Sequence, residues 1–184
     1  GAVGAVARSL GLGNQVCALS SASATGTEAI ATAAQRVHDG LASQMVAGGA
    51  EGASRYIWAG FDAMNLLNRR QNDNPAQASS PFSAAADGFV PSAGAGLLVL
   101  ESLENALNRE ARIYAEVAGW ATACGAQRGS RQRECGSTEA AVRCYRAALE
   151  KAEVSFGELD SINGHFSGAE CDARLMHASE AGIN

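Results

Sequence analysis

The sequence is poor in aromatic residues, proline and charge, and these shortages limit the classes of protein to which it can belong. Aromatic residues make up 5% of the 184 residues and charged residues 18%, and there are 3 prolines against 21 glycines. No apolar run approaches the roughly 20 residues needed to span a bilayer, so we expect no membrane partner. The net charge of −5 disfavours nucleic acid as a partner, because such partners favour basic surfaces.

The number and spacing of the cysteines do not suggest disulfide pairs or a metal site. The chain has an odd number of cysteines, and none forms a Cys-x-x-Cys pair: they are Cys17, Cys124, Cys135, Cys144 and Cys171. This pattern favours reduced thiols over disulfides or a zinc site. We therefore expect a cytoplasmic protein with no metal and no cofactor. Cys171 lies close in sequence to His165, which leaves a functional thiol at that position open.

The apolar pattern predicts a layered α/β domain. Hydrophobic residues make up 47% of the chain, enough for a core. Their spacing predicts strands that alternate with helices, an order typical of α/β folds. The predicted helices are 2–10, 24–39, 56–67, 101–109 and 137–152. The predicted strands are 15–20, a fully buried strand at 44–48, a pair within 90–100, and 113–120.

A run of small residues between the first predicted strand and the second helix is the leading candidate for a nucleophile site. Val16 to Leu19 is apolar, and Ser20-Ser-Ala-Ser-Ala-Thr-Gly26 follows it directly. Several enzyme folds present a nucleophile at such a turn, where the helix N-terminus favours developing negative charge. Ser23 is the candidate nucleophile, and the small neighbour Ala22 lets a substrate approach the backbone. The alternative is that Ser23 caps the helix, a common role of serine.

This run and the segments after it resemble one family. Ser20 to Gly26 is similar to the Ser-Thr-Ala-Cys-Xaa-Ser-Gly nucleophile segment of the β-ketoacyl-acyl-carrier-protein synthases, which have the thiolase fold. Further similar segments occur in the family's order across nearly all of the chain. They are Met45–Glu51, Gly60–Phe61, Asn72–Pro75, Ala78–Phe82, Asp87–Val90, Gly94–Gly96, Leu98–Glu101, Ala111–Glu116 and Ile162–His165.

The resemblance implies an incomplete thiolase-like fold of layered α-β-α-β-α type. Residues 1–111 would form the carboxy-terminal part of its first half, and residues 112–184 the start of its second half. The family's opening strands and its later Lys- and Gly-Gly-Phe-containing segments have no counterpart in the sequence. We therefore expect part of a longer polypeptide, a processed fragment, or a protein that another chain completes.

The resemblance also implies the chemistry of the site. Ser23 stands where the family has its nucleophilic Cys, and His165 matches the first catalytic His and is the candidate base. Ala22, Phe61 and Phe166 are the candidate substrate-binding residues. The implied partners are an acyl carrier protein or acyl-CoA, and a second ketosynthase-like chain in a homodimer or heterodimer.

Several positions depart from the family's pattern. The family's second His has no counterpart, Phe166 replaces a glycine, and the segment from His165 to Asp172 is one residue short. The family's charged side chains are also missing at four positions that normally form loop ion pairs: Ser80, Ser83, Ala86 and Ala93.

The sequence supports three hypotheses. The chain is an acyltransferase acting through Ser23, a non-catalytic pairing subunit similar to chain-length factors, or a degenerate or engineered fragment. Two arginine groups, Arg69–Arg70 and Arg128–Arg133, are either carrier-docking patches or ordinary solvated loops. We expect His38 and His177 to be surface or packing residues.

Overall fold

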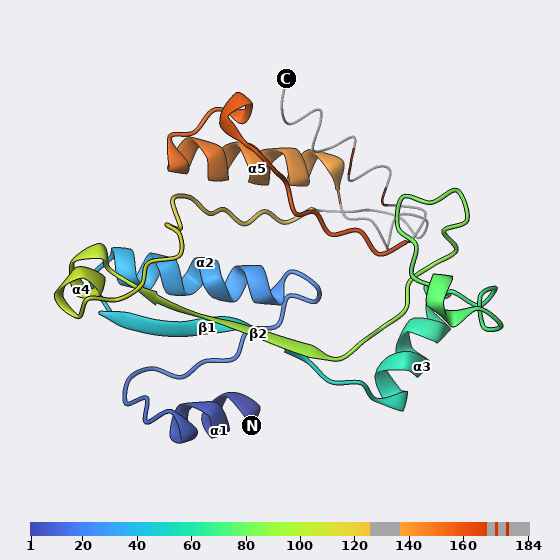
Figure 1. The fold of residues 1–184 in the computed structure, drawn as a ribbon, viewed down its shortest axis with the longest axis horizontal. Coiled ribbons are helices and arrows are strands. Elements are labelled where there is room, and N and C mark those ends of the chain that lie inside the picture. Colours follow the sequence, from blue (N-terminus) through green and yellow to red (C-terminus); the bar gives the residue numbers. More distant parts are fainter. Residues whose placement is uncertain (126–136, 169–171, 173–175, 177–184) are drawn as a thin grey trace. The chain divides into compact units, whose positions relative to one another are not determined.

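The helices form close to the positions that the apolar spacing predicts (Figure 1). The computed structural model describes residues 1–125, 137–168, 172 and 176. Serine side chains cap three helices by accepting a hydrogen bond from a backbone N–H of the first turn: Ser54, Ser102 and Ser137. The helices are α1 (Ala2–Ser9), α2 (Thr25–His38), α3 (Arg55–Ala63), α4 (Leu103–Asn108) and α5 (Thr138–Ala152), with short 3₁₀ turns η1 (Pro75–Gln77) and η2 (Phe156–Glu158).

The chain divides into two compact units. The first combines residues 1–50 with 95–112, and the second combines residues 51–94 with 113–184. Both units are therefore built from segments that are not continuous in the sequence. The expected division into thiolase-like halves at residue 111 stays a prediction.

The first unit is built on a two-stranded sheet of β1 (Gln44–Glu51) and β2 (Gly94–Glu101). Gln44 bonds to Glu101, and Gly48 lies against Gly96 and Leu97, so the strands run antiparallel. The approach at Gly48 is very close, because a methyl group placed there would lie 2.0 Å from the Gly96 carbonyl oxygen. Glycine is therefore required at the centre of this strand pair.

Helix α2 runs alongside this strand pair (Figure 1). Its second residue, Gly26, contacts β1 through the backbone: a methyl group on Gly49 would lie 3.3 Å from the Gly26 Cα. Three alanines on α2 are buried: Ala31, Ala33 and Ala34. Small side chains thus set the helix directly onto its neighbours.

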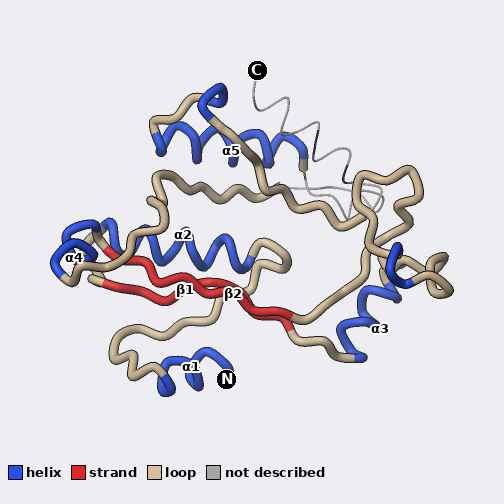
Figure 2. Tube along the Cα trace, viewed as in Figure 1, coloured by secondary structure: helices blue, strands red, loops and turns tan. Residues whose placement is uncertain are grey.

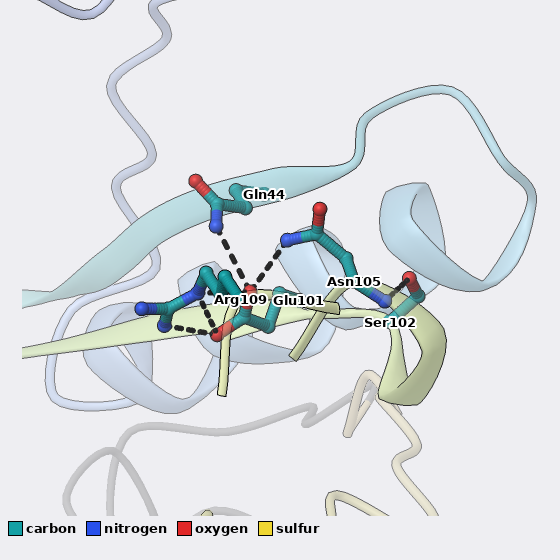
Figure 3. Close-up of polar contacts among 5 residues, drawn as sticks. All are labelled: Gln44, Glu101, Ser102, Asn105 and Arg109. Atoms are coloured by element: carbon teal, nitrogen blue, oxygen red, sulfur yellow. Dashed lines mark hydrogen bonds and ion pairs between the residues drawn. The ribbon is translucent and has the colours of Figure 1, made fainter. Parts of the chain in front are cut away.

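A polar cluster joins the end of β2 to α4 and to the start of β1 (Figure 3). Glu101 accepts hydrogen bonds from Gln44 Nε2 at 2.9 Å, Asn105 Nδ2 at 2.5 Å and Arg109 Nε at 2.9 Å. Arg109 also donates through its Nη2. These bonds lower the pKa of the Glu101 carboxyl from 4.5 to about 2, with the Arg109 hydrogen bond as the largest cause and the Gln44 hydrogen bond next.

In the second unit, most of the described residues outside α3, α5 and the short 3₁₀ turns lie in loops (Figure 2). The extended segment before α5 lies against that helix: a methyl group on Gly119 would lie 2.2 Å from the Ala148 carbonyl oxygen. Lys151 sits 3.6 Å from the centre of the Trp120 ring. These contacts hold residues 119–120 on the face of α5.

Several predicted elements differ from those observed. Residues 15–20 and 113–120 form no strand, because no hydrogen-bonded neighbouring strand lies among the described residues. Within 90–100 there is one strand rather than a pair, and β1 is mainly half-buried rather than fully buried. Helix α3 stops at Ala63 because the chain turns at Asn65, whose φ of 57° is left-handed.

The core is made of small side chains. The buried apolar residues among those described are all alanine: Ala7, Ala31, Ala33, Ala34, Ala47, Ala78, Ala106 and Ala140. The larger side chains of Trp58 and Met64 are exposed within this chain. In the described part of the chain, no helix has the combination of length and apolar content that a membrane span requires.

Candidate active site

Ser23 lies exposed in the turn before α2. The residue that flanks the helix is Ala24, which makes no side-chain capping bond. The alternative interpretation of Ser23 as the helix cap is therefore wrong. Ser23 precedes the cap by one residue, where the positive end of the helix dipole favours negative charge.

Hydrogen bonds from α2 hold the turn that carries Ser23. The Ser21 N–H donates to Thr25 Oγ1 at 2.9 Å, and that hydroxyl donates to the Ala22 carbonyl at 2.6 Å. The Ser21 hydroxyl donates to the Glu28 carboxylate. Ala22 adopts a left-handed φ of 52°, which is uncommon for a residue with a Cβ.

His165 also lies exposed, in the loop that begins after η2. The half-buried Phe166 ring folds back over Gly164, where a methyl group would lie 2.2 Å from a ring carbon. The same ring contacts Phe82, with ring centres 4.4 Å apart. Phe166, at the position where the resembling family has a glycine, therefore makes an aromatic contact immediately beside His165.

Asp172 organises the loop after His165. This carboxylate is 6% exposed and accepts bonds from the Ser167 N–H at 3.1 Å, the Ser167 hydroxyl at 3.3 Å and the Gly168 N–H at 2.6 Å. The Gly168 carbonyl in turn accepts a bond from the Gly88 N–H at 3.0 Å. The loop after His165 is thus tied to the segment around Gly88.

Phe61, the remaining candidate substrate-binding residue, is half-buried on α3. Its ring meets Phe89 edge-on, with ring centres 4.6 Å apart. Of the candidate residues, Ala22 and Ser23 share one turn of the first unit, whereas Phe61, His165 and Phe166 belong to the second. Their roles in binding and catalysis stay predictions.

Two ion pairs lie among the described residues next to the loop that contains Ser80, Ser83 and Ala86. Arg70 pairs with Asp87 at 3.3 Å, and Arg69 bonds to Asp62 through two nitrogens, at 2.6 and 3.0 Å. These contacts favour a structural role for Arg69 and Arg70 over carrier docking. By contrast, the Ser80 hydroxyl is buried without a hydrogen-bond partner among the described residues.

Among the described residues, the other candidates from the sequence show no contacts that indicate a role in a site. His38 is exposed beside Asp39, as expected of a surface residue. Burial raises the pKa of the Cys144 thiol. Within residues 1–125 and 137–168, no cluster of His, Cys, Asp and Glu fits a metal ion. The group Arg128–Arg133 and the residues Cys135, Cys171 and His177 lie outside the described residues.

Sequence reasoning did not identify Glu28 or Asp172 as parts of the site. The spacing of Ser21, Thr25 and Glu28 could have found the first, because residues three apart share one face of a helix. Asp172 comes seven residues after His165 in the sequence, and spacing alone does not predict its three bonds.

Comparison with known proteins identifies the family. Residues 1–106 match the N-terminal domain of β-ketoacyl synthase. The chain is 42% identical over 160 residues to 3-oxoacyl-[acyl-carrier-protein] synthase 2 of Rhizobium meliloti (strain 1021), a match covering 86% of this chain and 38% of that protein. The chain is 37% identical to 3-oxoacyl-[acyl-carrier-protein] synthase 1 of Escherichia coli (strain K12), a match covering 80% of this chain and 34% of that protein. The chain thus spans well under half the length of these relatives.

Solved structures give the same result. One is a type II polyketide synthase acyl-carrier protein in complex with its ketosynthase, with a TM-score of 0.90, 31% identity, and coverage of 99% of this chain and 44% of the other. A β-ketoacyl synthase from Burkholderia phymatum STM815 has a TM-score of 0.82 and 32% sequence identity, and the match covers 89% of this chain and 39% of that one. The ishigamide ketosynthase/chain length factor has a TM-score of 0.86 and 29% sequence identity, and the match covers 98% of this chain and 42% of that one. The thiolase-like fold is confirmed, and the chain belongs to the β-ketoacyl synthase family.

Proposed function

We propose that this chain is part of a β-ketoacyl synthase-like acyltransferase of fatty-acid or polyketide synthesis, in which Ser23 carries the acyl group. The observation that supports this most directly is the exposed position of Ser23 immediately before α2. The donor is an acyl thioester, on an acyl carrier protein or on coenzyme A. The ketosynthase structure that holds an acyl-carrier protein supports this choice of partner.

The proposed step is a transfer from sulfur to oxygen. The Ser23 Oγ attacks the thioester carbonyl while the His165 imidazole takes the hydroxyl proton. The oxyanion that forms is stabilised by the N-terminal end of α2, and it collapses by breaking the carbon–sulfur bond. The thiolate takes the proton from His165, leaving an acyl-Ser23 ester and a free thiol.

Serine at this position limits the later chemistry of the acyl group. A serine hydroxyl is far less acidic than a thiol, so it depends on the base, and its oxyester is a poorer target for a carbanion than a thioester. The proposal is therefore limited to acyl transfer and does not extend to decarboxylative condensation. Ala22, Phe61 and Phe166 are the proposed substrate contacts.

The test is the intact denatured mass of the protein after incubation with an acyl thioester, beside a Ser23→Ala variant. The proposal expects an added acyl mass that disappears in Ser23→Ala and weakens in His165→Ala. An unchanged mass in the wild-type protein, or an equal gain in Ser23→Ala, would overturn it.

A non-catalytic pairing subunit is the alternative. The similarity to a ketosynthase/chain length factor and the unpartnered Ser80 hydroxyl favour it. In that case the chain gains no acyl mass but forms a stable complex with a Cys-bearing ketosynthase, which size-exclusion chromatography with light scattering detects. A degenerate or engineered fragment would do neither.

A further inference from the structure

We propose that Glu28 is a positioning residue for Ser23: its carboxylate anchors Ser21 and thereby holds the left-handed turn that exposes the nucleophile. The inference rests on the proposed function of Ser23. Glu28 touches neither substrate nor reacting atoms in this scheme, and it acts through Ser21.

Ser21 is held by side chains from one face of α2. Thr25 and Glu28 are three residues apart on α2, so their side chains lie on the same face. Thr25 accepts a hydrogen bond from the Ser21 backbone, and Glu28 accepts one from the Ser21 side chain. Ser21, Thr25 and Glu28 are all half-buried, which limits competition from water.

The backbone between these anchors needs such support. Ala22 has a φ of 52°, a conformation that L-residues other than glycine rarely adopt. Two neutral bonds from Thr25 fix one side of the turn. The bond from the Ser21 hydroxyl to an ionised carboxylate is charge-assisted and therefore stronger than a neutral one. Glu28 thus adds a tie through a carboxylate to the two ties that Thr25 makes between α2 and the turn.

Helix α2 provides a rigid base for this tie. Gly26 lies between Thr25 and Glu28 in the sequence and contacts Gly49 of β1 through the backbone. A carboxylate in the first turn is also favourably placed against the helix dipole. The position of Ser23 is therefore set from the sheet through α2 and Glu28 to Ser21.

The experiment uses the full chain carrying Ser23→Cys, which makes the position reactive toward iodoacetamide whether or not it accepts acyl groups. Glu28→Ala and Glu28→Gln are compared in this background. Mass analysis of peptides measures the rate of alkylation at position 23 separately from that of the native cysteines. Both variants are neutral, so their difference reports the hydrogen bond to Ser21 rather than the charge. The glutamine retains an oxygen that accepts this bond.

The expected result is a rate at position 23 that falls about tenfold or more in Glu28→Ala, since small misplacements of a reacting group have large effects on rate. Glu28→Gln returns it to within about threefold of the parent, and Ser21→Ala causes the same loss as Glu28→Ala with no further loss in the double variant. The matched control is Glu139→Ala, which removes a similar Ser–Glu bond at the start of α5 and leaves the rate unchanged.

Equal rates in Glu28→Ala and Glu28→Gln would overturn the proposal, as would additive effects of Ser21→Ala and Glu28→Ala. Circular dichroism checks that each variant folds. If Glu28→Ala does not fold, Glu28→Asp takes its place, because the shorter side chain keeps the charge and withdraws it from Ser21. Failure of wild-type Ser23 to accept an acyl group would refute the proposed function alone, since the alkylation series does not depend on it.

Discussion

Glu101 links three segments of the first unit through one carboxylate. Its bonds to Arg109, Gln44 and Asn105 all require the ionised form or are strengthened by it. Protonation of this single group therefore loosens the contact between β1, β2 and α4 at once.

The pH dependence of this contact has a definite sign. The Glu101 carboxyl has a pKa of about 2 in the folded chain, below its ordinary value of 4.5. The stabilisation is thus complete above 4.5 and is lost as the pH falls toward 2. We expect Arg109→Gln to unfold at lower urea concentration than the wild type at pH 6, with the difference shrinking toward pH 2. Urea titrations at stepped pH measure it, and a difference independent of pH would contradict the assignment.

At the scale of elements, the β1–β2 pair depends on the absence of a side chain at Gly48. A methyl group there would meet the Gly96 carbonyl oxygen at 2.0 Å and the Leu97 Cα at 2.9 Å, and both are backbone atoms that cannot rotate away. We expect Gly48→Ala to destabilise the chain by about 1–3 kcal/mol or more, as overpacking does.

Gly4→Ala is the matched control for this prediction. Gly4 lies within α1, and a methyl group there meets nothing within 4 Å. Alanine favours the helix over glycine by about 1 kcal/mol, so this variant should be neutral or more stable. Denaturant unfolding compares the two, and equal stability of both variants would show that the strand contact is not close.

The same elements show what the sequence predicts and what it does not. The period of Ala29, Ile30, Ala33 and Ala34 predicted α2 to within a residue, and Val3 and Val6 predicted α1. The segments 15–20 and 113–120 were predicted as strands from apolar composition alone. A strand also needs a neighbour for its backbone hydrogen bonds, and apolar composition does not reveal which neighbour is present.

The candidate site shows the same division. Ser23 and its place before a helix were predictable from the order of small residues and apolar period. The left-handed Ala22 and the tie from Glu28 were not, because they depend on side-chain bonds across the turn. The contact of Phe166 with Phe82 joins residues far apart in the sequence, and no local pattern indicates it.

At the scale of the whole molecule, the alanine core leaves larger apolar side chains at the surface. Leu97 and Val99, on one face of β2, are 50% and 61% exposed. Exposed apolar surface of this kind favours association. We expect analytical ultracentrifugation of the chain to give a mass above 18.8 kDa at micromolar concentration.

The variant Val99→Lys tests the source of this association. A charge on the exposed face of β2 should shift the measured mass toward that of the monomer, because burying a lysine against a second surface is unfavourable. Tyr114→Lys is a suitable comparison, since that side chain is 83% exposed and lies outside the strands. A wild-type chain that stays at 18.8 kDa at every concentration would contradict the prediction.

The contact between Gly26 and Gly49 has a mechanical consequence. With no side chain between the two backbones, there is no rotamer that can change to absorb a displacement. We therefore expect a shift of β1 to move the start of α2, and with it the turn that carries Ser23. On this argument, substitutions in the β1–β2 pair should alter reactivity at position 23 although none of their side chains contacts it.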